Sequence, residues 1–427
     1  MQKIYKAKWI LPGNEKIIQN GAILVENGKI LEVFNRDELE NISCNEITDY
    51  GNAVITSGFI NLHTHLQFTD LQKPQNNLNR NFSGWILELI KQYASLTPEQ
   101  KINSLKNGLK EAVLSGTTCV AQISREEEFL DVFNSAEIKS YIFLETFSNC
   151  EESSFAEFKK LKEKFKRMEQ NKALNVNLGV SPHSVYNVHP VLWKKISDFA
   201  CSNNILVHTH LAESLDEMDW LKNGFSNIDL IHKFVGWQKV SPFETGLNPV
   251  QYLKKLDILR PLGKNLIAAH LNQLEGDSIY EFAEYGANIA LCPRSNLFLS
   301  ANAHHRSTLE GLEACECGLA TGLGTDSKFS NYDLNILNEA KYIKSGFNLL
   351  KLLDMLTINS AKILKLDHKI GSLEKGKDVD FLVFKLEQDE SYLDLLDKER
   401  PDEVYISGNQ VVDNFNLSMS DDFKPDN

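Results

Sequence analysis

Two histidines, His63 and His65, stand one residue apart at the end of an apolar stretch that begins at Gly58. In an extended strand, residues i and i+2 point to the same side, so both imidazoles can face one point in space. That arrangement can clamp a metal ion. A single pair of this kind also turns up by chance on surface strands, so the interpretation depends on further ligand-type residues elsewhere in the chain.

Such residues stand at the ends of later predicted strands. They are His183, His208, His210, Glu213, His270, Arg294, Ser295, Asn296 and Asp326. With the first pair, six of the eleven histidines fall at strand ends. A histidine that is hydrogen-bonded in the core is the usual structural explanation for any one of them. No structural role requires this shared placement, so together they favour a metal site.

The elements that would position these residues alternate between strand and helix. Predicted strands cover 58–65, 117–123, 140–147, 175–182, 205–211, 266–271, 288–293 and 319–325, and predicted helices include 99–115, 155–170, 190–203, 276–285 and 333–346. Eight strands with intervening helical regions predict an α/β fold, the (β/α)8 TIM barrel, whose active site lies at the C-terminal ends of its strands. The segment 214–262 is longer than a usual connection, and we expect it to contribute to a lid or a substrate wall.

The two ends of the chain consist of short strands and turns. Asn27-Gly28 separates two apolar runs, which favours a hairpin with a primed turn. Similar runs return only after position 378, and neither group is expected to be stable alone, so we expect one small β-sandwich built from both chain ends. The predicted organisation is 1–57 and 366–414 for the sandwich, 58–365 for the TIM barrel, and 415–427 for a flexible tail.

Composition narrows the class of protein. The 427 residues are 42% hydrophobic, and no apolar run approaches the roughly 18 residues of a membrane span. A formal charge of −13 without a dense basic stripe argues against nucleic acid as a partner. The first residues lack the apolar core of a signal peptide, and the seven cysteines are irregularly spaced, as in a reducing compartment. We therefore expect a cytoplasmic protein that binds neither membrane nor nucleic acid.

Several motifs together carry a resemblance to a known family. They are His63-Thr64-His65-Leu66, Phe82-Ser83-Gly84-Trp85, Asn248-Pro249-Val250-Gln251-Tyr252-Leu253, Cys292-Pro293-Arg294-Ser295 and Gly324-Thr325-Asp326-Ser327 with Ser330-Asn331. The chain resembles the amidohydrolase superfamily over nearly its whole length, in the branch of metal-dependent aminohydrolases that deaminate purine-like substrates. Within that branch it looks most like the aminodeoxyfutalosine deaminases. Many relatives are dimers, so the resemblance also allows a homodimer.

The resemblance implies a metal site and a set of catalytic roles. His63, His65, His210 and Asp326 would hold one divalent ion, zinc or iron(II), and this ligand set leaves a position open for water. Glu213 would protonate a ring nitrogen of the substrate, although an acidic residue there could also simply begin the next helix. His270 would hydrogen-bond the attacking water, and Asp326 would accept its proton. No lysine ends strand four, so one metal ion is expected instead of two.

The resemblance also suggests residues for binding a heterocyclic small molecule. His183 would orient the substrate. Arg294 and Ser295 would line the pocket mouth, although an arginine there could equally pair with a neighbouring carboxylate. Trp85, with Phe68 and Phe329, would offer aromatic surface or plain packing. His208 is expected to pack behind the ligands, and His304 and His305 to lie at the rim or in solvent.

Three functions are compatible with the sequence. The first is a hydrolytic deaminase that removes an exocyclic amine from a purine-like substrate, such as aminodeoxyfutalosine or a related adenine nucleoside, and releases ammonia. The second is a hydrolase that opens a cyclic amide or displaces chloride from a triazine with the same mononuclear site. The third is a non-catalytic scaffold with the amidohydrolase fold. A scaffold predicts broken ligands, whereas all four ligand positions are intact here.

Overall fold

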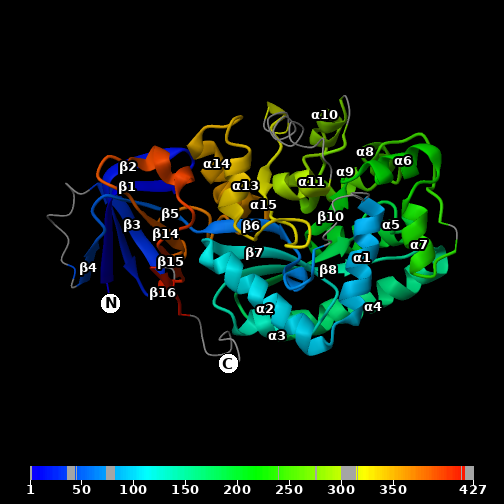
Figure 1. The fold of residues 1–427 in the computed structure, drawn as a ribbon, viewed down its shortest axis with the longest axis horizontal. Coiled ribbons are helices and arrows are strands. Elements are labelled where there is room, and N and C mark those ends of the chain that lie inside the picture. The colour runs from blue at the N-terminus through cyan, green and yellow to red at the C-terminus, as the bar shows by residue number, and fades with distance from the viewer. Residues whose placement is uncertain are drawn as a thin grey trace.

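The computed structural model describes residues 2–35, 44, 46–73, 82–238, 240–274, 277–299, 314, 316–414 and 416–418. Eight parallel strands form one curved sheet at the centre of the larger lobe (Figure 1). In chain order they are β6 (Phe59–Thr64), β7 (Thr117–Ser124), β8 (Lys139–Thr146), β9 (Val176–Pro182), β10 (Val207–Leu211), β11 (Leu266–His270), β12 (Asn288–Leu291) and β13 (Thr321–Leu323). Each strand pairs with the next one along the chain, as in a TIM barrel. The predicted fold class is confirmed.

Helices surround this sheet. The connections carry α2 (Pro98–Leu114), α3 (Phe129–Ser135), α4 (Glu151–Asn171), α5 (Pro190–Asn203), α10 (Ser278–Ala283), α11 (Pro293–Leu299) and α13 (Ile336–Tyr342), followed by α14 (Leu349–Leu356) and α15 (Ile358–Ile363). Helix α2 begins where the sequence favours it, because Thr97 forms a capping box with Gln100 and Pro98 occupies the first helical position. An additional helix, α1 (Phe82–Ser95), precedes α2 and was not predicted.

The barrel closes where its last strand meets its first. Thr64 and Asp326 form a parallel bridge, and the backbone N–H of Asp326 donates to the carbonyl of His63 at 2.9 Å. Gly324 allows this approach, because a Cβ on it would lie 2.6 Å from the Cβ of His63. Two residues predicted to bind metal are therefore joined by the closure itself.

The long segment after β10 folds into helices. It contains α6 (Leu215–Asn223), α7 (Ile228–Phe234), α8 (Pro249–Lys255) and α9 (Leu259–Leu262). Helix α6 starts at Ser214, whose hydroxyl accepts from the backbone N–H of Glu217, and ends at Gly224 in a left-handed conformation. Helix α7 contacts α1, so these two helices stand together over one edge of the barrel mouth.

The second lobe is a mixed sheet made from both chain ends, at the left of Figure 1. Its strands are β1 (Gln2–Gly13), β2 (Lys16–Glu26), β3 (Lys29–Asn35), β4 (Glu46–Asp49), β5 (Ala53–Ser57), β14 (Phe381–Lys385), β15 (Glu403–Ile406), β16 (Asn409–Asp413) and β17 (Asn416–Leu417). Antiparallel pairing of β5 with β14 joins the two ends. The predicted hairpin is present between β2 and β3, with positive φ at both Asn27 and Gly28.

A buried lysine attaches the sandwich to the base of the barrel. Lys139, at the start of β8, places its ammonium 2.8 Å from both carboxylate oxygens of Asp380 and 3.3 Å from Asp378. Its ammonium also donates to the hydroxyl of Ser407 at 3.1 Å. Two carboxylates and a hydroxyl oxygen thus accompany a charge that would be costly to bury alone.

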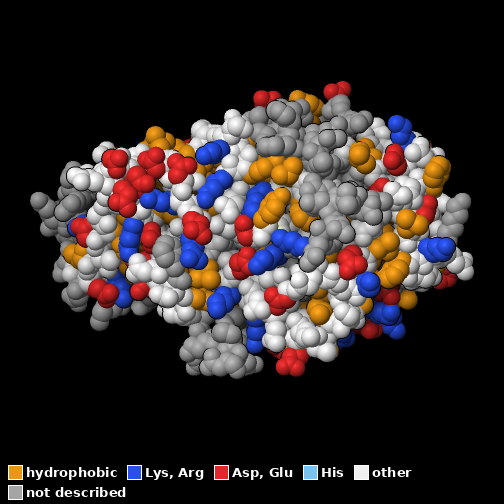
Figure 2. Space-filling view, in the orientation of Figure 1, with side chains coloured by type: hydrophobic (Ala, Val, Ile, Leu, Met, Phe, Trp, Pro, Cys, Tyr) orange, Lys and Arg blue, Asp and Glu red, His pale blue; other side chains and the backbone are white. Residues whose placement is uncertain are grey.

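The surface matches the composition. On the face shown in Figure 2, basic and acidic side chains of the described residues are interspersed. Within the described ranges, no helix is both long enough and apolar enough to span a bilayer.

Candidate active site

The C-terminal ends of three barrel strands, β6, β10 and β13, bring the predicted metal ligands together. His63 is the penultimate residue of β6, and His65 follows that strand and precedes a short 3-10 helix. His210 lies near the end of β10, and Asp326 follows β13. Asp326 Oδ1 lies 3.6 Å from Nε2 of His63 and 3.8 Å from Nε2 of His65, and the Nε2 atoms of His65 and His210 are 3.1 Å apart. All four side chains are buried and converge on one point.

Hydrogen bonds to groups outside the cluster leave Nε2 of His210 and Oδ1 of Asp326 facing its centre. The Nδ1 atom of His210 lies 3.0 Å from the carbonyl oxygen of His183, so Nδ1–H can donate outward while Nε2 faces the cluster. Asp326 Oδ2 accepts from the hydroxyls of Ser295 at 2.7 Å and Ser330 at 2.6 Å, which leaves Oδ1 toward the imidazoles. Neither ring nitrogen of His63 has a hydrogen-bond partner within the described part of the chain.

These residues fit one divalent metal ion such as zinc. Three imidazoles and one carboxylate are ligands that zinc and ferrous iron accept, and the set leaves a coordination position free. Buried ring nitrogens without a hydrogen-bond partner destabilise the fold unless another group, such as a metal ion, binds them. Burial by itself raises the pKa of the Asp326 carboxyl, but the adjoining imidazoles, His63 first, more than offset it and hold that pKa below its usual range. The carboxylate is therefore in the form that binds a cation.

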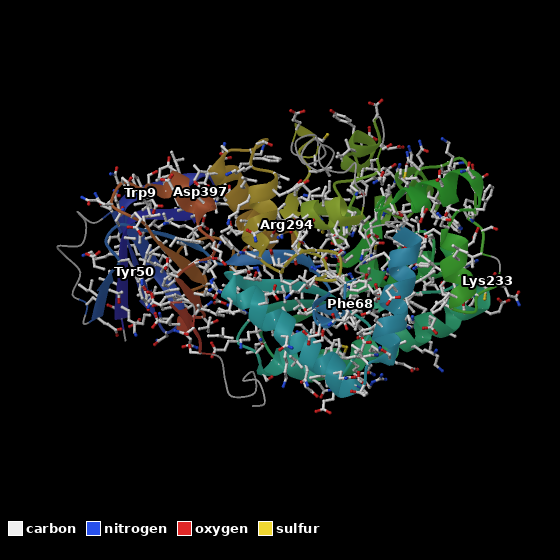
Figure 3. The ribbon with its side chains drawn as sticks, in the orientation of Figure 1. Trp9, Tyr50, Phe68, Lys233, Arg294 and Asp397 are labelled. Carbon is white, nitrogen blue, oxygen red and sulfur yellow. The ribbon has the colours of Figure 1, made fainter. Side chains whose placement is uncertain are left out.

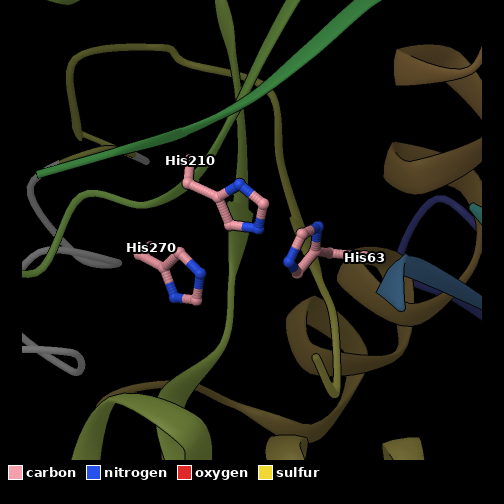
Figure 4. A group of neighbouring side chains, drawn as sticks. All are labelled: His63, His210 and His270. Atoms are coloured by element: carbon pink, nitrogen blue, oxygen red, sulfur yellow. The ribbon is translucent and has the colours of Figure 1, made fainter. Parts of the chain in front are cut away.

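Two further residues, His270 and Glu213, lie beside the cluster, and Glu213 also lines the cavity. His270, at the end of β11, shares its surroundings with His63 and His210 (Figure 4). Its Nδ1 lies 2.9 Å from the side-chain oxygen of Asn296, and its Nε2 lies 3.6 Å from a carboxyl oxygen of Glu213. Burial, with the nearby Asp326 and Glu217, raises the pKa of Glu213 well above its usual range. Glu213 can therefore hold a proton beside His270.

The cluster opens into a cavity of about 410 Å³ at the barrel mouth. Its wall includes His65, His183, His210, Glu213 and Asp326, so the buried donors are continuous with a space that a small molecule could enter. Aromatic and aliphatic side chains from α1 and from the region of α7 form another part of the wall: Trp85, Ile86, Leu89, Ile90, Ile231, Val235 and Trp237. The segment 214–262 thus supplies part of the cavity wall.

Trp85 and His183 face the cavity, as predicted for substrate contacts. The indole N–H of Trp85 donates to the carbonyl of Phe329 at 3.3 Å, which orients its ring. The ring of His183 is held by Asn187 through Nδ1. Phe68 also lines the cavity and stacks on His65, with ring centroids 5.4 Å apart.

Arg294 and Ser295 differ from their predicted position at the pocket mouth, because neither lines the cavity in the described structure. The guanidinium of Arg294 makes two hydrogen bonds of 2.8 Å to Asp333 and lies 3.5 Å from Glu339. It sits where α11 and α13 meet (Figure 3). Ser295 donates to Asp326 instead of facing the cavity. Both residues support the site from behind.

His208 packs behind the ligands, as predicted. Its ring stacks on that of His63, with centroids 4.9 Å apart, and its Nε2 lies 3.3 Å from the carbonyl oxygen of Leu62. His304 and His305 fall outside the described residues.

Several residues that line the cavity were not predicted from the sequence. Glu145 lies at the end of β8, where the rule applied to the histidines would have found it. Arg125 directly follows β7, so the same rule would have found it as well. His232 and Trp237 belong to the inserted segment, which carries no local signal for the direction of individual side chains.

A comparison with known families decides the wider relationship. The model of the amidohydrolase family matches residues 54–411. The chain belongs to the amidohydrolase family. The predicted superfamily is therefore confirmed, and with it a hydrolase that acts on carbon–nitrogen bonds.

Individual relatives are more distant. A 5-methylthioadenosine/S-adenosylhomocysteine deaminase from Thermodesulfovibrio yellowstonii is 27% identical over 411 residues, covering 90% of this chain and 85% of the relative. Helicobacter pylori aminofutalosine deaminase, solved with methylthio-coformycin, has a TM-score of 0.79 at 20% identity over 96% of this chain and 100% of that one. Atrazine chlorohydrolase from Arthrobacter aurescens, solved with zinc, has a TM-score of 0.78 at 17% identity over 98% and 97%. At these identities the two structures support the fold alone.

Proposed function

We propose that this protein is a metal-dependent deaminase that hydrolyses the exocyclic amine of an adenine nucleoside and releases ammonia. The observation that carries the proposal is the group formed by Glu213, His270 and Asp326, whose polar side-chain atoms lie within 4.8 Å of one another. Glu213 and Asp326 also line the cavity. A proton donor, a hydrogen-bonding imidazole and a carboxylate thus stand around one place where a water and an aromatic ring can meet. The 27% identical relative, a nucleoside deaminase by name, supports the same substrate class.

The residues divide the proton transfers among them. His63, His65, His210 and Asp326 would hold the ion, which when bound makes water more acidic and a better nucleophile near neutral pH. His270 accepts a hydrogen bond from the attacking water through Nε2, because Nδ1 is occupied by Asn296. Asp326 takes a proton from that water as its oxygen bonds to the carbon that carries the amine. Glu213 protonates the adjacent ring nitrogen, and the departing amine receives the proton held by Asp326 and leaves as ammonia. The proton that remains on the new hydroxyl passes back to Glu213 as the ring carbonyl forms, which restores Glu213 for the next turnover.

Two other reactions are compatible with the same ligand set: displacement of chloride from an aromatic ring and hydrolysis of a cyclic amide. Protonation of a ring nitrogen by Glu213 assists displacement of an amine or a chloride from an aromatic ring, whereas a cyclic amide gains less from it. The likeness in fold to a chlorohydrolase keeps a halogenated triazine as the second candidate. A non-catalytic scaffold would not need four intact ligands, a buried proton donor and an accessible cavity in one place.

A substrate panel tests the proposal. Purified protein loaded with zinc or iron(II) is incubated with adenosine, 5-methylthioadenosine, S-adenosylhomocysteine, aminodeoxyfutalosine, atrazine and a cyclic amide, and the products are analysed for ammonia, chloride and carboxylate. We expect ammonia from at least one adenine nucleoside and none from Glu213→Ala. Chloride or carboxylate without ammonia would identify the second class of hydrolase, and no product from fully loaded protein would favour the scaffold.

A further inference from the structure

Glu145 is a buried acid that the proposed chemistry does not use. It is the penultimate residue of β8, its side chain is 11% exposed, and it lines the cavity. Its Oε1 atom has no hydrogen-bond partner within the described part of the molecule. A carboxyl oxygen that is buried without a partner is costly, and one that faces a cavity can be completed by a ligand.

The nearest polar atom in the wall belongs to His183. Its Nε2 lies 3.8 Å from Glu145 Oε1, which is too long for a direct hydrogen bond. The ring of His183 cannot easily turn away, because Nδ1–H can donate to the side-chain oxygen of Asn187 at 3.1 Å, which leaves Nε2 as an acceptor. Two polar atoms at this separation can both reach a single oxygen placed between them, one as donor and one as acceptor. A hydroxyl group has the required donor and two lone pairs.

The charge around this point favours a neutral group. Among the described residues that line the cavity, Arg125 is the one lysine or arginine. Its guanidinium lies over the ring of Phe147, 4.8 Å from the ring centroid. The carboxyl groups of Glu145, Glu157, Glu213 and Asp326 line the same space. Burial raises the pKa of Glu145 to about 8, which suits an uncharged carboxylic acid that donates a hydrogen bond. A phosphate placed here would meet an acidic wall.

We infer that Glu145 and His183 together bind a hydroxyl group of the substrate's sugar, and that Glu145 is a specificity residue for ribonucleosides. The inference rests on the proposed function, since a sugar enters the cavity only if the substrate is a nucleoside. Glu145 lies beside His183, whereas the reacting group is expected beside Glu213 and His270, which lie next to each other. The ring and the sugar would therefore occupy different parts of one cavity.

Analogues that lack one hydroxyl test the inference without changing the protein. The kcat/KM of the zinc-loaded enzyme is measured with adenosine, 2′-deoxyadenosine and 3′-deoxyadenosine. We expect at least one deoxy analogue to react about tenfold less efficiently than adenosine, mainly through KM, because removing the hydroxyl leaves Glu145 unpaired. Glu145→Ala should remove this preference by slowing the reaction of adenosine and not that of the poor analogue.

Two variants guard against a general effect of substitution. Glu145→Gln retains a hydrogen-bonding group and should keep part of the preference. Glu152→Ala removes an exposed carboxylate from α4, outside the cavity wall, and should keep all of it. Thermal unfolding of each variant shows whether the fold is retained. If Glu145→Ala does not fold, Glu145→Gln and the analogue series in the unmodified enzyme still test whether Glu145 binds the sugar hydroxyl.

The failures of the two proposals are distinguishable. Equal kcat/KM for all three nucleosides, or an unchanged preference in Glu145→Ala, overturns the role of Glu145 while deamination itself stands. No ammonia from any adenine nucleoside overturns the proposed function and the sugar contact together.

Discussion

The backbone N–H of Glu213 donates a hydrogen bond of 2.9 Å to the side-chain carboxylate of Glu217. The other oxygen of that carboxylate accepts from the N–H of Ala212 at 3.1 Å. Ala212 has a φ of +51°, a left-handed conformation that residues with a Cβ rarely adopt. Glu217, which is fully buried, therefore holds the bend that points Glu213 into the cavity. It is a positioning residue, since it does not line the cavity itself.

Replacing Glu217 with glutamine should lower kcat for ammonia release by roughly tenfold to a hundredfold, with a smaller change in KM. The amide can accept only one of the two backbone N–H bonds, so the bend at Ala212 loses part of its support. Steady-state kinetics on the best nucleoside, together with thermal unfolding, measure both effects.

The matched control for that substitution is Glu403→Gln in the sandwich. Glu403 is also a buried carboxylate, and it accepts from Tyr50 and Gln410. We expect this variant to lose stability without losing kcat. If Glu217→Gln also keeps its kcat while it loses stability, Glu217 has only a structural role.

Removal of one imidazole should release the ion. We expect His63→Ala to bind zinc more than about a hundredfold more weakly than the unmodified protein and to release no measurable ammonia, because the remaining ligands cannot complete the site. Elemental analysis after dialysis gives the metal content. An equimolar ion retained by His63→Ala would mean that the ligands lie elsewhere.

Arg294 separates a structural role from a substrate-binding role. Arg294→Met removes the partner of Asp333 and leaves the buried Glu339 without its nearby cation, so we expect a loss of about 3 kcal/mol in the free energy of unfolding. KM for the nucleoside should stay unchanged, because Arg294 does not line the cavity. Urea unfolding and steady-state kinetics provide the two values. A raised KM with unchanged stability would place Arg294 at the substrate after all.

The pair formed by Asp333 and Arg294 also predicts a dependence of stability on pH. Burial alone raises the pKa of Asp333, but the hydrogen bonds from Arg294 outweigh it and the net pKa is lowered. A carboxyl with a lowered pKa in the folded state stabilises the protein above its unfolded pKa of about 4, and this contribution is lost as the pH falls further. Asp333→Asn should therefore be less stable than the unmodified protein at pH 7, and the difference should shrink below pH 4 in urea titrations. A constant difference would contradict this assignment.

The barrel and the positions of its ligands followed from local patterns. Residues at the ends of parallel strands meet at one face, so His63, His210, His270 and Asp326 could be grouped before any contact was known. The hairpin at Asn27-Gly28 was equally accessible, because its turn depends on adjacent residues alone.

Contacts between distant segments were not accessible in this way. The acid at position 217 lies in the first turn of a helix, where acidic residues are common for reasons of the helix dipole, and nothing local shows that it turns back to Ala212. The position of Arg294 beside Asp333 depends on how α11 and α13 pack, which the order of residues along the chain does not specify. The open alternative of an ion pair proved to be the correct one for this arginine.

The closure of the barrel between β6 and β13 has a consequence for how the chain matures. His63 is synthesised long before Asp326, yet the hydrogen bond between their backbones closes the sheet and brings together two side chains that we propose as metal ligands. A chain that stops before residue 326 lacks both the last proposed ligand and the contact between the first and last strands. On this proposal, the metal site is completed only after nearly the whole barrel has been synthesised.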